Sequence, residues 1–116
     1  MNDKDDRLYL IHIKECIERI EKYSVRGEKA FYNDELVQTF IIHNVQIIGE
    51  AISKISDRFR EQHPEVPWRQ INAMRNIIVH NYNGIDIDVV WKVTRGDLSV
   101  LKEQVENMLT YGDDSK

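Results

Sequence analysis

The sequence predicts an all-α protein, an antiparallel helical bundle of four main helices with one short extra helix. Long stretches of the chain repeat apolar residues at three- and four-residue steps, the spacing of one helix face. Its 116 residues include only five glycines and two prolines, which is little turn chemistry for an all-β fold. Strand-like alternation is confined to residues 85–89, a stretch too isolated to pair. The length suits one domain, so we expect residues 1–116 to form a single helical domain.

The first helix is expected to begin in the acidic residues 3–6, where carboxylates favour the positive end of the helix dipole. Four apolar residues form its inner stripe: Leu10, Ile13, Ile17 and Ile20. Cys16, the only cysteine, is interpreted as a small buried hydrophobic residue of this helix. Gly27 is expected to stop the helix, and residues 28–33 are expected to form a short turn whose two aromatic residues pack on the bundle.

The second long helix is expected to be capped by Asn33 or Asp34 and to end at His63. Its inner stripe is long: Ile41, Val45, Ile48, Ile52, Ile55 and Phe59. Further apolar residues widen this face, which predicts a helix that is central in the bundle or shares its second face with another subunit. His43 and Gln46 lie off the stripe and are interpreted as surface or interface residues.

A third helix is expected from about Pro67, which suits a first helical turn, to about His80. Its inner face consists of Trp68, Ile71, Met74 and Ile78. Asp86 can cap a short helix, and Thr94-Arg95-Gly96-Asp97 is interpreted as a capping box that opens the final helix. The inward residues of that last helix are Leu98, Leu101, Val105, Met108 and Leu109.

The charge distribution argues against general nucleic-acid binding but favours one local anion site. The net charge is −4. Residues 54–75, however, carry five basic residues against three acidic ones and lead directly into residues 75–82. No apolar run reaches the length of a membrane span or a signal peptide, so we expect a cytoplasmic protein that does not contact a membrane.

Residues 75–82 place Arg75, Asn76, His80 and Tyr82 at the end of an apolar helical pattern. Arginine offers a planar fork for phosphate, and histidine can move a proton near neutral pH. Arg75 and His80 are five residues apart, roughly 140° around a helix, so they would approach one anion from two sides, most readily in a dimer groove. Such a set suits metal-free cleavage of an RNA phosphodiester. From spacing alone, helix capping or surface ion pairing is an open alternative.

The remaining histidines, His12, His43 and His63, show no spacing typical of metal ligands. Glycine-rich phosphate loops and nucleophile elbows are also absent from the sequence. We therefore expect no metal and no cofactor.

The segment Arg75-Asn76-Ile77-Ile78-Val79-His80-Asn81-Tyr82 resembles the Arg-x4-His-x-Tyr motif of the HepT toxins, a branch of the HEPN superfamily. The likeness extends in order and spacing over nearly the whole chain. The other matching blocks are Asp6-Arg7-Leu8, Ile47-Ile48-Gly49-Glu50-Ala51, His63-Pro64-Glu65-Val66-Pro67-Trp68 and Ile87-Asp88-Val89-Val90-Trp91. Glu50 is a candidate to hold Arg75 or a capping group.

This resemblance implies a HEPN-fold homodimer whose two motifs face each other across a cleft. It also implies a metal-independent ribonuclease that acts on mRNA or tRNA and is toxic when uncontrolled. Arg75 and His80 would be catalytic and Asn76 supporting. The partner would be MntA, a minimal nucleotidyltransferase that neutralises the toxin by attaching AMP to the tyrosine of the motif, here Tyr82.

Two other functions are considered. The chain could be a non-catalytic nucleotide-binding or helper subunit of a minimal nucleotidyltransferase, because a helical bundle of this kind also suits that task. Alternatively, it could be a purely structural dimerisation domain, in which Arg75 and His80 affect stability alone.

Overall fold

The computed structural model describes residues 3–69 and 87–114, and every regular element in these ranges is helical. Three helices are long: α1 (Asp3–Ser24), α3 (Glu35–Ser53) and α7 (Leu98–Asp114). The short elements are α2 (Glu28–Asn33), α4 (Asp57–Gln62), α6 (Ile87–Lys92) and the π-helix η2 (Val93–Asp97). The all-α prediction is confirmed, with more short helices than the single one expected.

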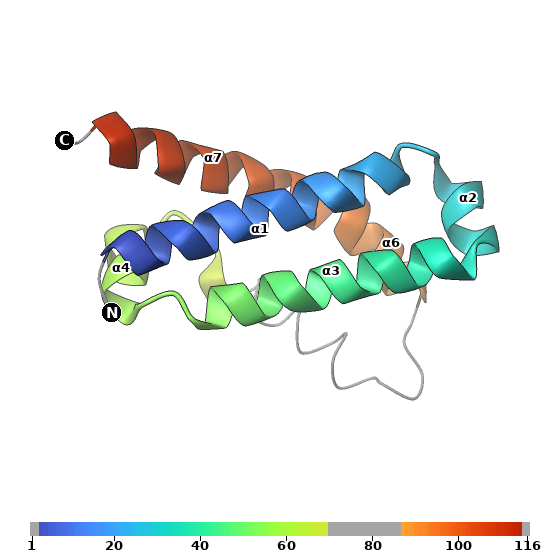
Figure 1. The fold of residues 1–116 in the computed structure, drawn as a ribbon, viewed down its shortest axis with the longest axis horizontal. Coiled ribbons are helices and arrows are strands. Elements are labelled where there is room, and N and C mark those ends of the chain that lie inside the picture. The colour runs from blue at the N-terminus through green and yellow to red at the C-terminus, as the bar shows by residue number, and fades with distance from the viewer. Residues whose placement is uncertain (1–2, 70–86, 115–116) are drawn as a thin grey trace.

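Helix α1 lies between α3 and α7 and runs antiparallel to both (Figure 1). Helix α2 caps one end of this arrangement, and α4 lies at the other end, beside the start of α1. The predicted third helix falls mostly outside the described residues; only its first positions, Trp68 and Arg69, are seen, and they are helical. The α1–α3–α7 layer is therefore the described scaffold.

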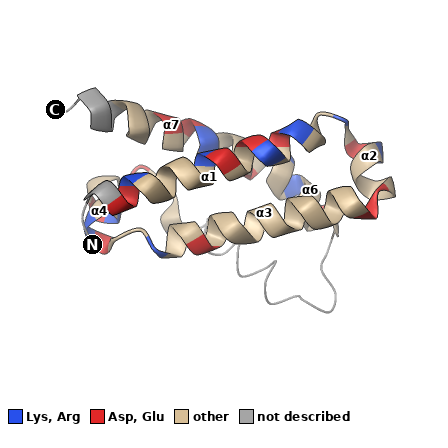
Figure 2. Cartoon of the chain, viewed as in Figure 1, with Lys and Arg blue, Asp and Glu red and all other residues tan. Residues whose placement is uncertain are grey.

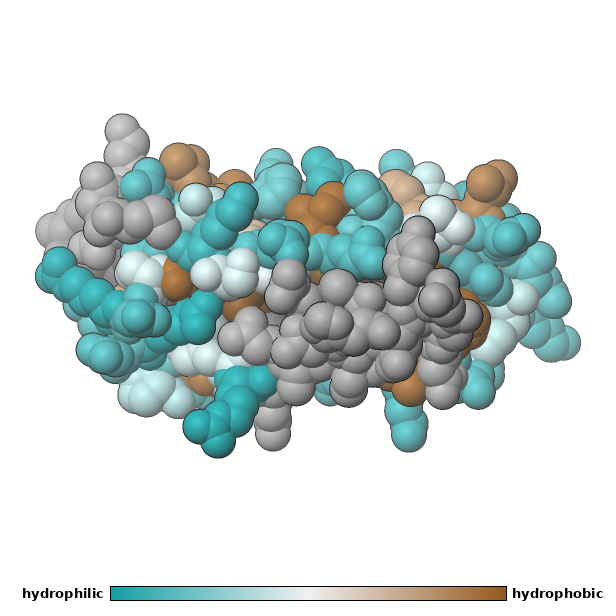
Figure 3. All heavy atoms as spheres, turned by 90° about the horizontal axis from the view of Figure 1, so that it is seen from below, coloured by the Kyte–Doolittle hydropathy of each residue, from teal (hydrophilic) through white to brown (hydrophobic). Residues whose placement is uncertain are grey.

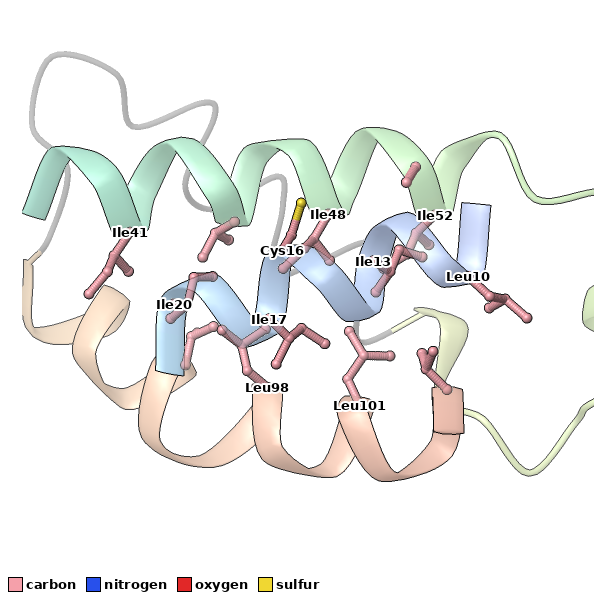
Figure 4. Packing of buried hydrophobic residues seen from close by; sticks show 14 of the residues in the cluster. Leu10, Ile13, Cys16, Ile17, Ile20, Ile41, Ile48, Ile52, Leu98 and Leu101 are labelled. Atoms are coloured by element: carbon pink, nitrogen blue, oxygen red, sulfur yellow. The ribbon is translucent and has the colours of Figure 1, made fainter. Parts of the chain in front are cut away.

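The core of this scaffold is built from the stripes that the sequence predicts. Figure 4 shows the α1 stripe facing α3 on one side and α7 on the other. The residues labelled there, all at most 3% exposed, are Leu10, Ile13, Cys16, Ile17, Ile20, Ile41, Ile48, Ile52, Leu98 and Leu101. Cys16 is thus a core residue, as predicted. Burial raises the pKa of its thiol, and Arg19 offsets part of this effect, so the thiol stays protonated and inert at neutral pH.

The turn between α1 and α3 differs from the prediction. Residues 28–33 form the helix α2 instead of a simple turn. Gly27, with a φ of 97°, reverses the chain, and Phe31 is buried and stacks on Trp91 at 4.9 Å between ring centroids. Burying this ring on one face stabilises a helical turn that the short sequence pattern did not reveal. Asp34 then caps α3, as predicted, by accepting hydrogen bonds from the backbone N–H groups of Leu36 and Val37.

The second long helix is shorter than predicted. Helix α3 ends at Ser53, and α4 begins at Asp57, although the apolar stripe continues through Ile55 and Phe59. The physical reason is Ser56, which leaves the helical conformation with ψ at 152° and caps α4 by accepting from the Phe59 N–H. The stripe is therefore carried by two helices with a bend between them.

The capping box predicted at residues 94–97 is wrong. These residues belong to η2, which continues from α6 into α7 without a cap. Because η2 follows α6 directly, residues 94–97 lie inside a continuous helical segment and not at a helix start, where unpaired N–H groups would need a cap. Thr94 is buried, and its hydroxyl has no hydrogen-bond partner in the described structure. The predicted inner face of α7 is confirmed, with Leu109 only partly buried.

Helix α3 carries no Lys, Arg, Asp or Glu between Glu35 and Glu50, whereas α1 and α7 carry charged residues at several positions (Figure 2). Lys102 donates to Glu21 at 2.9 Å, which links α7 to α1 and raises the pKa of the lysine ammonium. The described surface in Figure 3 is mainly hydrophilic with separate hydrophobic patches. Within the described residues, no helix has the length and apolar character needed to cross a membrane.

Candidate functional site

The four residues predicted to form the site all lie outside the described residues. Arg75, Asn76, His80 and Tyr82 belong to the range 70–86, for which the structure gives no geometry. What it does describe are the two flanks from which this range continues. The first flank ends at Trp68 and Arg69 beside α4, and the second begins with α6.

The flank before the motif is held by contacts of Trp68. Its indole N–H donates to the His63 carbonyl at 3.0 Å, and its backbone N–H donates to the Val66 carbonyl at 2.8 Å. The guanidinium of Arg60 lies 5.9 Å from the Trp68 ring centroid, within range of a cation–π contact. Val66 is buried among the core residues. The connector from His63 to Trp68, which contains Pro64 and Pro67, is therefore held in place by side-chain contacts.

A buried carboxylate ties this flank to α1. Asp6 is 1% exposed, and its two oxygens accept from the Ser56 N–H and from the Ser56 hydroxyl, each at 2.8 Å. Sequence reasoning gave residues 3–6 only a role at the helix dipole and missed this contact. The sequence did contain a signal for a new helix at this point, because Ser56 followed by Asp57 is typical of a helix start. The apolar stripe from Ile41 to Phe59 runs across it without a break.

The flank after the motif is organised by aromatic side chains. Tyr32 donates its hydroxyl hydrogen to the Asp88 carboxylate at the start of α6. Trp91 stacks on the Phe31 ring, and the Arg95 guanidinium lies 5.7 Å from the indole centroid. Helix α6 therefore sits against α2, at the end of the molecule opposite α4 (Figure 1). The two described flanks, residues up to Arg69 and residues from Ile87, thus lie toward opposite ends of the α1–α3–α7 layer.

An open groove of about 520 Å³ runs between α1 and α3. Its apolar lining includes Tyr9 and Ile47, and its polar lining includes His12, His43 and Glu50. Both histidines are exposed, which confirms the surface position expected for His43. Glu50 lines this groove. Its predicted contact with Arg75 stays a prediction, because Arg75 lies outside the described residues.

The side chains that the structure describes contain no group of three or more His, Cys, Asp or Glu residues that could hold a metal ion. His63 instead lies 3.2 Å from a carboxylate oxygen of Glu65, an exposed pair within the connector. This contact joins two residues of the same connector.

Comparison with known proteins adds what the described geometry lacks. The chain matches the HepT-like family, described as ribonuclease HepT-like, over residues 13–108. A protein of Thermococcus cleftensis named as a candidate ribonuclease HepT is 38% identical over 101 residues, which are 86% of this chain and 92% of that protein. A Methanocaldococcus jannaschii protein named as a candidate RNase is 33% identical over 107 residues, which are 91% of this chain and 98% of that protein.

A further relative is longer than this chain. It is a protein of Methanocaldococcus jannaschii named as a gamma-glutamylcyclotransferase and candidate RNase, 36% identical over 114 residues. The match covers 97% of this chain but 51% of that protein, so the chain spans about half of its length. No solved structure matches the chain at a significant level. The family match covers most of the chain, and the relatives that it resembles are named as ribonucleases. The chain therefore belongs to the HepT-like ribonuclease family.

Proposed function

We propose that this protein is the toxin of a HepT/MntA toxin–antitoxin system and a metal-independent endoribonuclease that cleaves mRNA or tRNA. The observation that carries the proposal is the family match over residues 13–108, since this range includes Arg75, Asn76, His80 and Tyr82. These residues supply the Arg-x4-His-x-Tyr pattern on which the resemblance to HepT rests. We further propose that residues 1–116 act as one domain.

The chemistry would use the 2′-hydroxyl of the RNA as the nucleophile. Its oxygen attacks the adjacent phosphorus, the bond from phosphorus to the 5′-oxygen breaks, and a 2′,3′-cyclic phosphate is left. His80 takes the proton from the 2′-hydroxyl or gives one to the leaving oxygen. Arg75 stabilises the charge that develops on the phosphoryl oxygens, and Asn76 orients one of these two side chains.

The site would be completed in a homodimer. Arg75 and His80 are five residues apart, so on one helix they point in directions roughly 140° apart. A second copy of the motif across a cleft would supply groups on the far side of the phosphate. Each copy also contributes the net-positive residues 54–75, which would offset the acidic balance of the rest of the chain where RNA binds.

The purified dimer is expected to cleave RNA with excess EDTA present and to leave 2′,3′-cyclic phosphate ends. Arg75→Ala should lower the rate by about 10²- to 10³-fold, because one stabilising donor is lost from the transition state. Gel analysis of a labelled RNA measures the cleavage rate, and light scattering measures whether the protein is a dimer. Substrates with a 2′-O-methyl group at the cleaved nucleotide are the matched control and should resist. Products with 3′-hydroxyl ends, or cleavage only with added Mg²⁺, would contradict the mechanism.

Regulation would act through Tyr82. We propose that an MntA-like nucleotidyltransferase transfers AMP from ATP to the Tyr82 hydroxyl and releases pyrophosphate. The phosphodiester formed brings a negative charge and a nucleoside beside the phosphate-binding site, so it would repel and block RNA.

Intact mass measurement of the protein co-expressed with its nucleotidyltransferase tests this regulation. We expect AMP-sized mass increases, loss of RNA cleavage in the modified protein, and neither change in Tyr82→Phe. Tyr32→Phe is the matched control, because the Tyr32 hydroxyl already donates to Asp88 far along the chain. Mass increases that persist in Tyr82→Phe would exclude Tyr82 as the acceptor. Modification of a protein that has no RNase activity before modification would favour the non-catalytic helper function.

A further inference from the structure

Two sequence blocks without an assigned role meet at one end of the molecule. One is Asp6-Arg7-Leu8, at the start of α1, and the other is the connector from His63 to Trp68. They are joined by Ser56 and Arg60, which lie at the start of α4 and within it. Figure 1 shows α4 beside the N-terminal end of α1, so residues far apart in sequence come together there.

The first half of this junction is the pair Asp6 and Ser56. Asp6 is almost fully buried, and both of its oxygens accept hydrogen bonds from the same residue, Ser56. The Ser56 hydroxyl in turn accepts from the Phe59 N–H at 3.1 Å and so starts α4. A buried charge is tolerated only with such partners, and removing the carboxylate would leave two donors unsatisfied. Asp6 therefore fixes where α4 begins.

The second half of the junction is Arg60. Its Nη2 donates to the Ile52 carbonyl near the end of α3 at 2.6 Å, and its guanidinium lies over the Trp68 ring. Trp68 is held at the same time by the His63 carbonyl. A change at Asp6 would be transmitted through Ser56 and α4 to Arg60 and then to Trp68. Arg69 follows directly, and the residues proposed to cleave RNA come next in the chain.

We propose that Asp6, acting through Ser56 and Arg60, is a positioning residue for RNA cleavage, an inference that rests on the proposed ribonuclease function. Asp6 touches no RNA; it sets the point and direction from which the chain enters the catalytic segment. Small displacements of reacting groups are known to slow enzymes strongly. The two sequence blocks thus gain a shared task, which is to fix the position of Trp68, from which the chain continues toward the proposed catalytic residues.

Asp34 offers a matched control, because it also accepts from two donors and caps a helix but lies at the start of α3, next to α2. Asp6→Ala is expected to lower kcat for RNA cleavage by about 10- to 100-fold with KM nearly unchanged. Asp34→Ala is expected to lower the midpoint of thermal unfolding while keeping kcat. Both are assayed well below their unfolding temperatures. An unchanged kcat in Asp6→Ala, or an equal loss in Asp34→Ala, overturns the proposal.

A second pair of variants covers the case in which Asp6→Ala does not fold. Ser56→Thr keeps the hydroxyl and should keep kcat, whereas Ser56→Ala should lower it; equal rates in the two variants overturn the proposal. Hydrogen exchange of the amides from residues 56 to 69 supplies a readout independent of cleavage. Faster exchange in Asp6→Ala than in Asp34→Ala supports the positioning role, and equal exchange contradicts it. Absence of RNA cleavage by the unmodified wild-type dimer counts against the proposed ribonuclease function instead.

Discussion

Replacement of His80 by alanine is expected to lower RNA cleavage by about 10²- to 10⁴-fold, the usual contribution of one general acid or base. The remaining side chains can still bind the phosphate, so KM should change less than kcat. Single-turnover cleavage of a labelled RNA in EDTA measures the effect, and circular dichroism with light scattering checks that the variant keeps the helical fold and the oligomeric state of the wild-type protein.

His43→Ala is the matched control for this experiment. His43 is an exposed histidine in the groove between α1 and α3, and no hydrogen bond of its ring is found in the described structure. Its replacement should leave the cleavage rate within about twofold, as surface substitutions usually do. If His80→Ala cleaves RNA as fast as His43→Ala, His80 is neither the acid nor the base, and the mechanism proposed above fails.

Replacement of Ile17 by alanine is expected to destabilise the protein by about 2–5 kcal/mol. Ile17 has no exposed surface and lies in the α1 stripe between α3 and α7 (Figure 4). Removing its outer atoms loses hydrophobic burial and leaves a cavity in a close-packed core. Urea unfolding followed by circular dichroism measures the free energy of unfolding.

Ile11→Ala is the matched control, because Ile11 lies on the same helix with 37% of its surface exposed. Its loss should cost about 1 kcal/mol or less. A similar fall in the unfolding free energy for both variants would mean that the α1 stripe does not form the centre of the core in solution.

The sequence was sufficient where one periodic pattern decided the structure. The stripes of α1 and α7, the buried Cys16 and the cap at Asp34 followed from spacing and side-chain chemistry alone. Prediction failed where a local signal competed with a longer pattern. The apolar stripe ran across Ser56, so the break between α3 and α4 was missed. Thr94 resembled a cap, although residues 94–97 lie inside the helical segment that runs from α6 into α7.

The candidate site stays a prediction made from residue types. The chemistry of Arg75, His80 and Tyr82 interrupts an apolar helical pattern in the sequence, and the family match covers all three positions. The contact of Asp6 with Ser56 could not be predicted from residue types. A carboxylate near a helix start is explained equally well by the dipole, and its contact with Ser56 spans 50 positions of the chain.

The close pairing of α1 with α3 has a consequence for the order in which the protein acquires its structure. Among the described helices, the most extensive contact joins α1 and α3, which are separated in sequence by little more than α2. Contacts of low sequence separation form quickly, and an N-terminal unit leaves the ribosome first. The hairpin of α1 and α3 is therefore expected to collapse during synthesis, before residues 75–82 have emerged. On a newly made chain, the pairing of α1 with α3 would therefore precede both the appearance of the proposed catalytic residues and the docking of α7.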